Sequence, residues 1–178
     1  MANRSKKVVI SARIEPYLKA ALDTAAAARN EKIVKVLETV IEEGLNEMFV
    51  PNPFQGGSLE GGEINFMAAF EAIWSEDEVL FKLRSGAMGP RFSGETLWRQ
   101  ASVVVTSEYF KGDYDLYGDL NGHAQKLSAT CKKYFVNLEL VRGEWPLIEG
   151  YISFLDANKN LSPSYEGYKK ILEASGSK

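Results

Sequence analysis

The chain has 178 residues, of which 45% are hydrophobic and 25% charged, and its formal net charge is -3 at pH 7. This composition is that of a globular protein with enough apolar material for one full core or two small ones. No run of apolar residues is long enough for a transmembrane helix, and no apolar signal sequence follows the basic start.

The chain contains one cysteine, Cys131, and one histidine, His123. A single thiol cannot form an internal disulfide and fits a reducing compartment. One Cys and one His also leave little material for a zinc site or for Ser-His or Cys-His catalysis. We therefore expect a cytoplasmic protein that is not an enzyme, with no catalytic residues, metal site or cofactor.

Positive charge is concentrated at the start of the chain. Residues 1–14 carry four basic side chains and no acidic one, whereas residues 15–48 and 49–178 each carry more acidic than basic side chains. The distribution of charge, more than its sum, decides whether a protein attracts nucleic acid. The net charge of -3 therefore does not exclude DNA binding, although a solvated basic arm fits the same pattern.

Residues 7–14 alternate between apolar and mixed side chains, which predicts a half-buried β-strand. One face of this strand carries Val8, Ile10, Ala12 and Ile14, and the other carries Lys7, Val9, Ser11 and Arg13. Pro16 ends the strand pattern and is well suited to the first position of a helix.

Two amphipathic helices follow the predicted strand. The first runs from Pro16 to about Arg29, and Asn30 is a plausible break because Asn tolerates turn conformations. The second carries one apolar stripe, formed by Ile33, Leu37, Val40, Ile41, Gly44, Leu45 and Met48. A strand and two helices are too small to bury this much apolar surface alone, and a lone strand leaves its edge unpaired. We therefore expect a homodimer through residues 7–48, in which two copies of the strand pair antiparallel.

The segment from Ile10 to Leu45 resembles the ribbon-helix-helix family, the class of the Met and Arc repressors. The resemblance rests on the strand ending in Arg13-Ile14, the spacing from Pro16 to Leu18, the helix with Leu22 and Ala25, and the helix from Ile33 to Leu45. It covers residues 6–48, a quarter of the chain. The resemblance implies a dimer whose two-stranded ribbon enters the DNA major groove.

The same resemblance implies two sets of DNA contacts. The outward face of the ribbon would contact bases through Lys7, Val9, Ser11 and Arg13. Phosphate contacts would come from Arg4, Lys6, Asn30, Lys32 and Lys35, the last three near the start of the second helix. The chain departs from the family here, with Asn30 where a small Gly is usual and Val34 where Ser or Thr is common. A plain helix cap at this turn is the alternative.

Residues 49–63 contain two Pro and four Gly and predict a linker between domains 1–48 and 64–178. The second domain is expected to be all-α. Its first half is expected to contain a helix over 66–74, a capping box of Ser75 with Glu78, a loop over 86–94 and a helix over 95–110 with strand-like residues 103–106. A packed turn or a binding loop is expected over 109–117. The rest is expected to contain a helix carrying Ala124 to Leu138, a helix starting at Pro146 and a final helix after Ser162-Pro163. In sum, we expect a mainly α protein.

The leading hypothesis for function is a sequence-specific transcriptional regulator, a repressor, that binds double-stranded DNA as a dimer. A second hypothesis keeps the DNA fold and makes the chain a plasmid or mobile-element partition or transfer factor, or an antitoxin, although the long aromatic C-terminal part disfavours an antitoxin. A third makes it a dimeric interaction protein without DNA binding. The sequence leaves open the protein or small-molecule partner of residues 64–178, and any assembly beyond a dimer.

Overall fold

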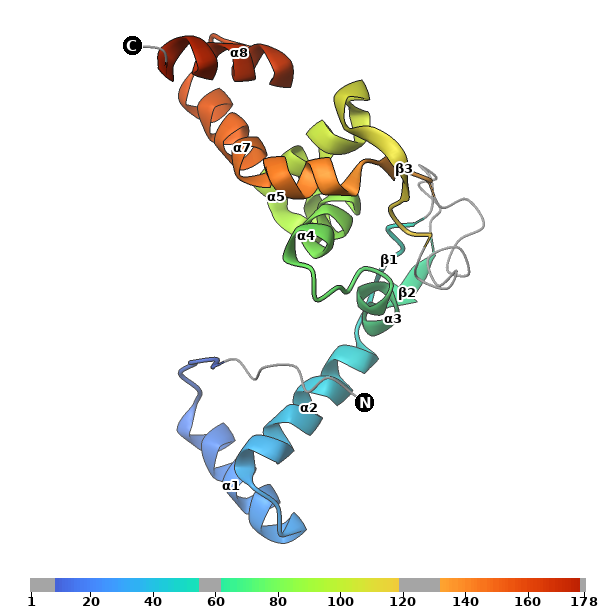
Figure 1. The fold of residues 1–178 in the computed structure, drawn as a ribbon. Coiled ribbons are helices and arrows are strands. Elements are labelled where there is room, and N and C mark those ends of the chain that lie inside the picture. The colour runs from blue at the N-terminus through green and yellow to red at the C-terminus, as the bar shows by residue number, and fades with distance from the viewer. Residues whose placement is uncertain (1–8, 55–61, 119–131, 177–178) are drawn as a thin grey trace. The chain divides into compact units, whose positions relative to one another are not determined.

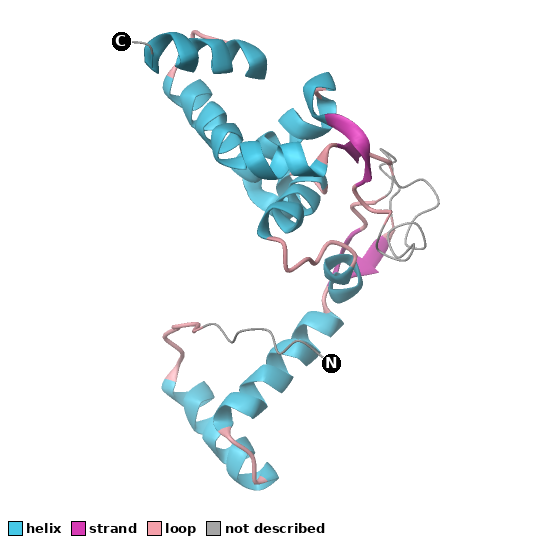
Figure 2. Cartoon of the chain, viewed as in Figure 1, coloured by secondary structure: helices cyan, strands magenta, loops and turns pink. Residues whose placement is uncertain are grey.

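A computed structural model describes residues 9–54, 62–118 and 132–176, and the chain divides into two compact units, Met1–Glu47 and Met48–Lys178. The described chain is mainly helical, with short strands only in the second unit (Figures 1 and 2). None of its described helices is long and apolar enough to span a membrane.

The N-terminal unit is a pair of helices, α1 (Pro16–Arg29) and α2 (Ile33–Glu47). Pro16 starts α1 because the first turn of a helix needs no N–H at that position. Asn30 ends α1 in the left-handed conformation, with φ of 51°. Its N–H donates to the carbonyl of Ala27, and the N–H of Glu31 donates to that of Ala26. This Schellman motif confirms the predicted break between the helices.

The segment predicted to be a linker belongs in part to the second unit. Strand β1 (Phe49–Pro51) pairs antiparallel with β2 (Glu63–Asn65), with Val50 opposite Ile64. Phe54 and Ile64 are both buried in the core of the second unit. The linker prediction is therefore wrong for residues 49–54 and 63, because β1 pairs with β2 and Phe54 is buried in this unit. Residues 55–61 lie outside the described part of the chain.

Three helices follow: α3 (Phe66–Glu71), α4 (Glu78–Ala87) and α5 (Pro90–Thr106). Asp77, not Ser75, caps α4, because its carboxylate accepts from the N–H groups of Val79 and Leu80. The loop predicted over 86–94 is largely helical. Only Gly89 and Gly94, both with positive φ, depart from helical conformation there.

The α4 and α5 helices form the most extensive helix pair of the second unit. A Cβ added at Gly86 would collide with the Cβ of Ala101 and would lie 2.6 Å from the carbonyl oxygen of Leu97. The backbone of α4 therefore approaches α5 closely. The strand-like residues 103–106 stay helical, because Val104 buries against the core from the α5 face.

A short 3₁₀ turn, Glu108–Phe110, leads into β3 (Lys111–Asp115), which pairs with β4 (Phe135–Val136) across a bulge. The all-α prediction for residues 64–178 is therefore wrong for β3, for β4 and for Ile64 and Asn65 of β2. Residues 109–117 form a packed turn and strand, with Phe110 and Leu116 fully buried.

The helix predicted over residues 124–138 is wrong for the described residues 132–137, because Phe135 and Val136 form a strand. Residues 119–131, including His123 and Cys131, lie outside the described residues. Helix α7 (Leu138–Ala157) begins eight residues before Pro146, where it was expected to start. Asn137 caps it by accepting from the N–H of Leu140. Its buried stripe, Leu138, Val141, Trp145, Ile148 and Ile152, has helical spacing. Burial of this stripe outweighs the cost of a proline inside a helix, about 3 kcal/mol.

The last helix, α8 (Tyr165–Gly176), confirms the predicted final helix. A half-buried polar network ties it to α7 and to the 3₁₀ turn. The carboxylate of Glu144 accepts from the hydroxyls of Tyr109 and Tyr165, at 2.6 and 2.7 Å, and from Nζ of Lys169 at 2.6 Å. Burial opposes ionisation of Glu144, but these three hydrogen bonds hold its pKa below the ordinary value.

Candidate functional site

The N-terminal unit has an open apolar groove between α1 and α2. The groove has a volume of about 400 Å³, and every side chain that lines it is apolar. It is bounded mainly by Ile14, Leu18, Leu22, Val36, Leu37 and Val40. These side chains come from the end of the predicted strand and from the facing sides of both helices. They are the residues that the periodicity of the sequence places on the buried faces, with the exception of Val36.

The groove is exposed in the single chain. Leu18 is 51%, Leu37 42% and Val40 50% exposed, while Ala26 and Val36 are the only described residues of this unit that are buried. Two buried side chains cannot offset the conformational entropy of ordering a unit of this size. The groove therefore marks a surface that this unit must cover to be stable.

The structure shows no strand over residues 9–14, the described part of the predicted strand. Both of its faces are exposed, with Val9 at 94% and Ile10 at 82%. A strand needs a neighbouring edge for its backbone hydrogen bonds, and the described single chain offers none to this segment. The predicted ribbon is thus not formed within one chain, and pairing between two chains stays a prediction.

The proposed base-contacting side chains lie at this segment. Arg13 and Ser11 are exposed, as is Val9, and Lys7 lies outside the described residues together with the phosphate candidates Arg4 and Lys6. Val9, Ser11 and Arg13 are therefore accessible to solvent, in a segment that has no regular secondary structure.

The other phosphate candidates gather at the turn between the helices. Asn30, Lys32 and Lys35 are all exposed. The backbone of Asn30 is engaged in the Schellman motif, and the carbonyl of Lys32 accepts from the N–H of Lys35 at 2.8 Å. The first turn of α2 contains no acidic side chain. Its first amides and the two lysines therefore make this end of α2 the more positive one.

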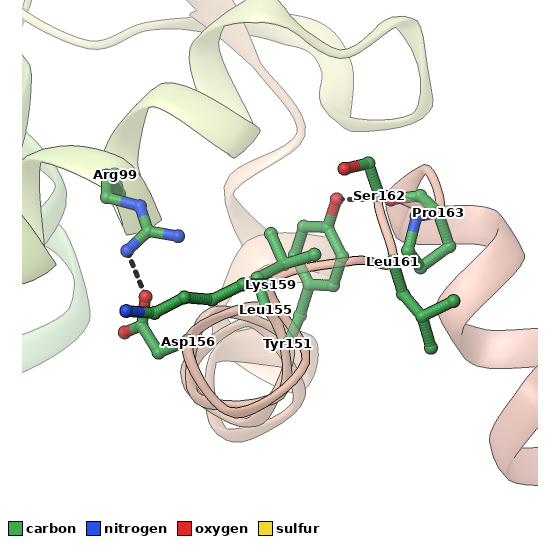
Figure 3. A pocket seen from close by; sticks show the side chains of 8 residues that line it. All are labelled: Arg99, Tyr151, Leu155, Asp156, Lys159, Leu161, Ser162 and Pro163. Carbon is green, nitrogen blue, oxygen red and sulfur yellow. Dashed lines mark hydrogen bonds and ion pairs between the residues drawn. The ribbon is translucent and has the colours of Figure 1, made fainter.

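The second unit has a hollow of about 400 Å³ between α5, α7 and residues 158–163. Arg99 crosses from α5 to bond Asp156 of α7 at 2.5 Å, and the hydroxyl of Tyr151 donates to the carbonyl of Pro163 at 2.7 Å (Figure 3). These polar groups hold the surrounding elements to one another. Both contacts therefore stabilise the packing of α5, α7 and residues 158–163.

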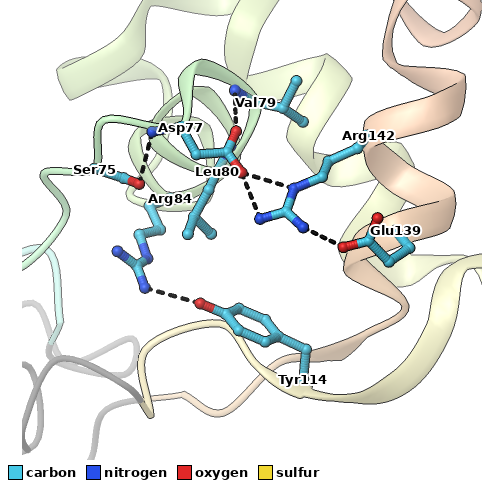
Figure 4. Close-up of polar contacts among 8 residues, drawn as sticks. All are labelled: Ser75, Asp77, Val79, Leu80, Arg84, Tyr114, Glu139 and Arg142. Carbon is cyan, nitrogen blue, oxygen red and sulfur yellow. Dashed lines mark hydrogen bonds and ion pairs between the residues drawn. The ribbon is translucent and has the colours of Figure 1, made fainter.

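A second set of polar contacts involves both ends of α4, with Asp77 at its start and Arg84 in its last turn (Figure 4). Arg84 is 2% exposed and donates to the carbonyl of Leu116 at 2.9 Å and to the hydroxyl of Tyr114 at 3.2 Å. Nearby, Arg142 bridges Asp77 and Glu139 at the surface. Burial opposes the charge on Asp77, but its hydrogen bonds to the Leu80 N–H and to Arg142 hold its pKa below the ordinary value.

Sequence reasoning did not find Arg84, because a buried arginine looks in sequence like any exposed helical arginine. Its four-residue spacing from Leu80 on an otherwise apolar helix face was the only available signal. Within the described ranges, no group of three Asp, Glu, His or Cys side chains could hold a metal ion.

No family model, curated protein or solved structure matches the chain. The function must therefore be argued from the residues and geometry described above.

Proposed function

We propose that the chain is a dimeric, sequence-specific DNA-binding protein of the ribbon-helix-helix type that regulates transcription as a repressor. The observation that carries this proposal is the open apolar groove of the N-terminal unit, next to residues 9–14, which are exposed and are the described part of a sequence that alternates with a period of two. Among the described residues of one chain, the groove has no apolar cover and the segment has no neighbouring strand edge, and a single partner can supply both.

A second copy is the occupant that satisfies both needs. Antiparallel pairing about a two-fold axis places identical segments side by side, so residues 7–14 of two copies supply each other with a strand edge. The same axis brings two grooves together, and the half-exposed Leu37 and Val40 become a shared core. An unrelated partner could fill the groove, but it would also have to supply a strand that matches the alternation of this segment.

Dimerisation would decide which side chains face the DNA. With Ile10, Ala12 and Ile14 turned toward the joint core, the opposite face presents Lys7, Val9, Ser11 and Arg13. A guanidinium can donate two hydrogen bonds to guanine, and a valine can contact the methyl group of thymine. The amides at the start of α2, with Lys32 and Lys35 beside them, suit a backbone phosphate.

The test is selection of bound sites from random duplex DNA with the full-length protein, followed by binding measurements at physiological salt in excess competitor. We expect Arg13→Ala to lose about 5- to 150-fold of its preference for the selected site, as the loss of a bidentate base contact predicts. Arg29→Ala, which changes an exposed arginine at the other end of α1, should retain the preference.

The oligomeric state is measured on the same samples. Arg13→Ala should sediment as the same dimer as the wild type, so that a loss of specificity cannot be attributed to dissociation. Retained site preference in Arg13→Ala, or a wild type that shows no preference at physiological salt, would contradict the proposal. A dimer without any site preference would instead favour a protein that only dimerises through this unit.

A further inference from the structure

The second unit contains a small cavity of about 200 Å³ between α3, α4 and the turn that begins α5. Its walls are apolar and rich in aromatic rings, and no charged side chain lines it. The residues that matter for its chemistry are Phe66, Phe70, Phe81, Phe92, Met88 and Ser85. Nothing in the proposed DNA contacts uses this cavity.

The aromatic wall is held in place by ring contacts. Phe70 stacks between Phe66 and Trp74, at centroid distances of 6.2 and 5.6 Å. Phe81 meets Phe70 edge-on at 6.1 Å and Trp74 at 5.4 Å. Such offset and edge-on pairs fix the orientation of each ring. The wall is therefore formed before any ligand arrives, which lowers the entropic cost of binding.

Ser85 supplies the single polar side chain of the cavity. The residue is only 9% exposed, and its hydroxyl has no hydrogen-bond partner in the described part of the chain. Every fully covered side-chain polar atom of the described residues does have a partner, so part of the Ser85 hydroxyl is accessible, and Ser85 is one of the residues that line the cavity. An unpartnered hydroxyl in an apolar pocket favours a ligand that can hydrogen-bond to it.

One wall of the cavity lies between two glycines with positive φ. Phe92 lies on a single helical turn, residues 90–93, between Gly89 with φ of 106° and Gly94 with φ of 75°. A Cβ at either glycine would meet nothing within 4 Å, so the two glycines serve backbone conformation and not close packing. Rotation about these two positions would move Phe92 toward or away from the cavity without unfolding α4 or the rest of α5.

We propose that this cavity binds a small, flat, uncharged molecule of one or two rings that carries one hydrogen-bonding group. The size follows from the volume, since an apolar protein cavity of about 150 Å³ holds a benzene molecule and drug-sized ligands need about 300 Å³ or more. The absence of charge follows from the lining, and the hydrogen-bonding group follows from Ser85. The site is independent of DNA binding, and its failure would leave the proposed function untouched.

The test compares two probes on the full-length protein by isothermal titration. Indole has an N–H that can donate to the Ser85 hydroxyl, and indene has nearly the same shape without that group. We expect both to bind, with indole about fivefold tighter, as one neutral hydrogen bond predicts. Ser85→Ala should remove this preference and retain indene binding. Ser153→Ala, at an exposed helical serine of α7, is the matched control and should keep the preference.

A second variant tests the wall. Phe92→Ala should weaken both probes about tenfold, while Phe135→Ala, which truncates a half-exposed phenylalanine on β4, should change neither. Near-ultraviolet circular dichroism verifies that each variant is folded; if Phe92→Ala unfolds, Ser85→Ala decides alone. No saturable binding at millimolar probe, or binding that neither variant changes, would overturn the proposal. Probe affinity that falls as protein concentration rises would also overturn it, in favour of a side chain from a second copy.

Discussion

The two units of this chain solve the problem of burying apolar surface in different ways. The unit Met48–Lys178 has a continuous core, in which Leu83, Phe110 and Ile148 are fully buried. The unit Met1–Glu47 has the same kind of apolar helix faces, but only Ala26 and Val36 are buried among its described residues. The difference shows that amphipathic helices alone do not make a core; a second face must cover them. In the first unit, the described residues of that unit do not supply such a face.

The largest effect is expected from a charge in the groove of the first unit. Leu37→Glu changes a side chain that is 42% exposed in one chain, so a lone monomer should tolerate it. If a second copy covers the groove, the variant would bury an unpaired carboxylate, and we expect the dimer dissociation constant to rise at least about 100-fold. Sedimentation equilibrium across a dilution series measures this change.

Ile171→Glu is the matched control, because Ile171 on α8 is 41% exposed but lies in the second unit. It should leave the dimer intact. Equal dimerisation of wild type and Leu37→Glu would show that the groove is not the subunit interface.

A smaller effect, confined to the second unit, is expected at its buried arginine. Arg84→Leu should lower the free energy of unfolding by about 3 kcal/mol, because it leaves the carbonyl of Leu116 and the hydroxyl of Tyr114 without their donor. Arg142→Leu, at the half-exposed ion pair of Figure 4, should cost about 1 kcal/mol or less. Urea unfolding followed by tryptophan fluorescence measures both, since all three tryptophans lie in this unit. Equal losses of unfolding free energy in the two variants would show that the buried hydrogen bonds of Arg84 stabilise this unit no more than a surface ion pair does.

An effect smaller than that of Arg84→Leu is a pH dependence in the polar network of α7 and α8. Because the folded pKa of Glu144 is depressed, its stabilisation is fully present above the ordinary carboxyl value of 4.5 and is lost as the pH falls through the lower folded value. Glu144→Gln should therefore be less stable than wild type at pH 7, by about 2 kcal/mol, and the gap should narrow as the pH falls toward 3. Thermal unfolding over this range tests the sign. A gap that stays constant with pH would assign the effect to packing instead of charge.

Local patterns in the sequence predicted much of the first unit and less of the second. Pro16, Asn30 and the spacing of Leu18, Leu22 and Leu37 were enough to place both helices and the faces that line the groove. In the second unit, Pro146 suggested a helix start, whereas the buried stripe from Leu138 carries the helix through it. The strand Phe135–Val136 was taken for helix because its partner, Lys111–Asp115, lies far away in the sequence.

Of the two candidate sites, one could be predicted from the sequence and the other could not. The proposed DNA-facing side chains, Arg13 among them, follow from the resemblance to the ribbon-helix-helix family, together with an alternation that is visible in eight consecutive residues. The cavity at Ser85 could not be found in this way, because its walls come from three segments and its polarity depends on a hydroxyl that the fold leaves unpartnered.

The sequence by itself determined the helices of the first unit and the concentration of positive charge at the start, because propensity, capping and period act over a few neighbouring residues. Only the tertiary structure decided the pairing of β1 with β2 and of β3 with β4, the burial of Arg84 and the cavity beside Ser85. These features depend on contacts between residues distant in the chain, whose free energy of burial can override local preference.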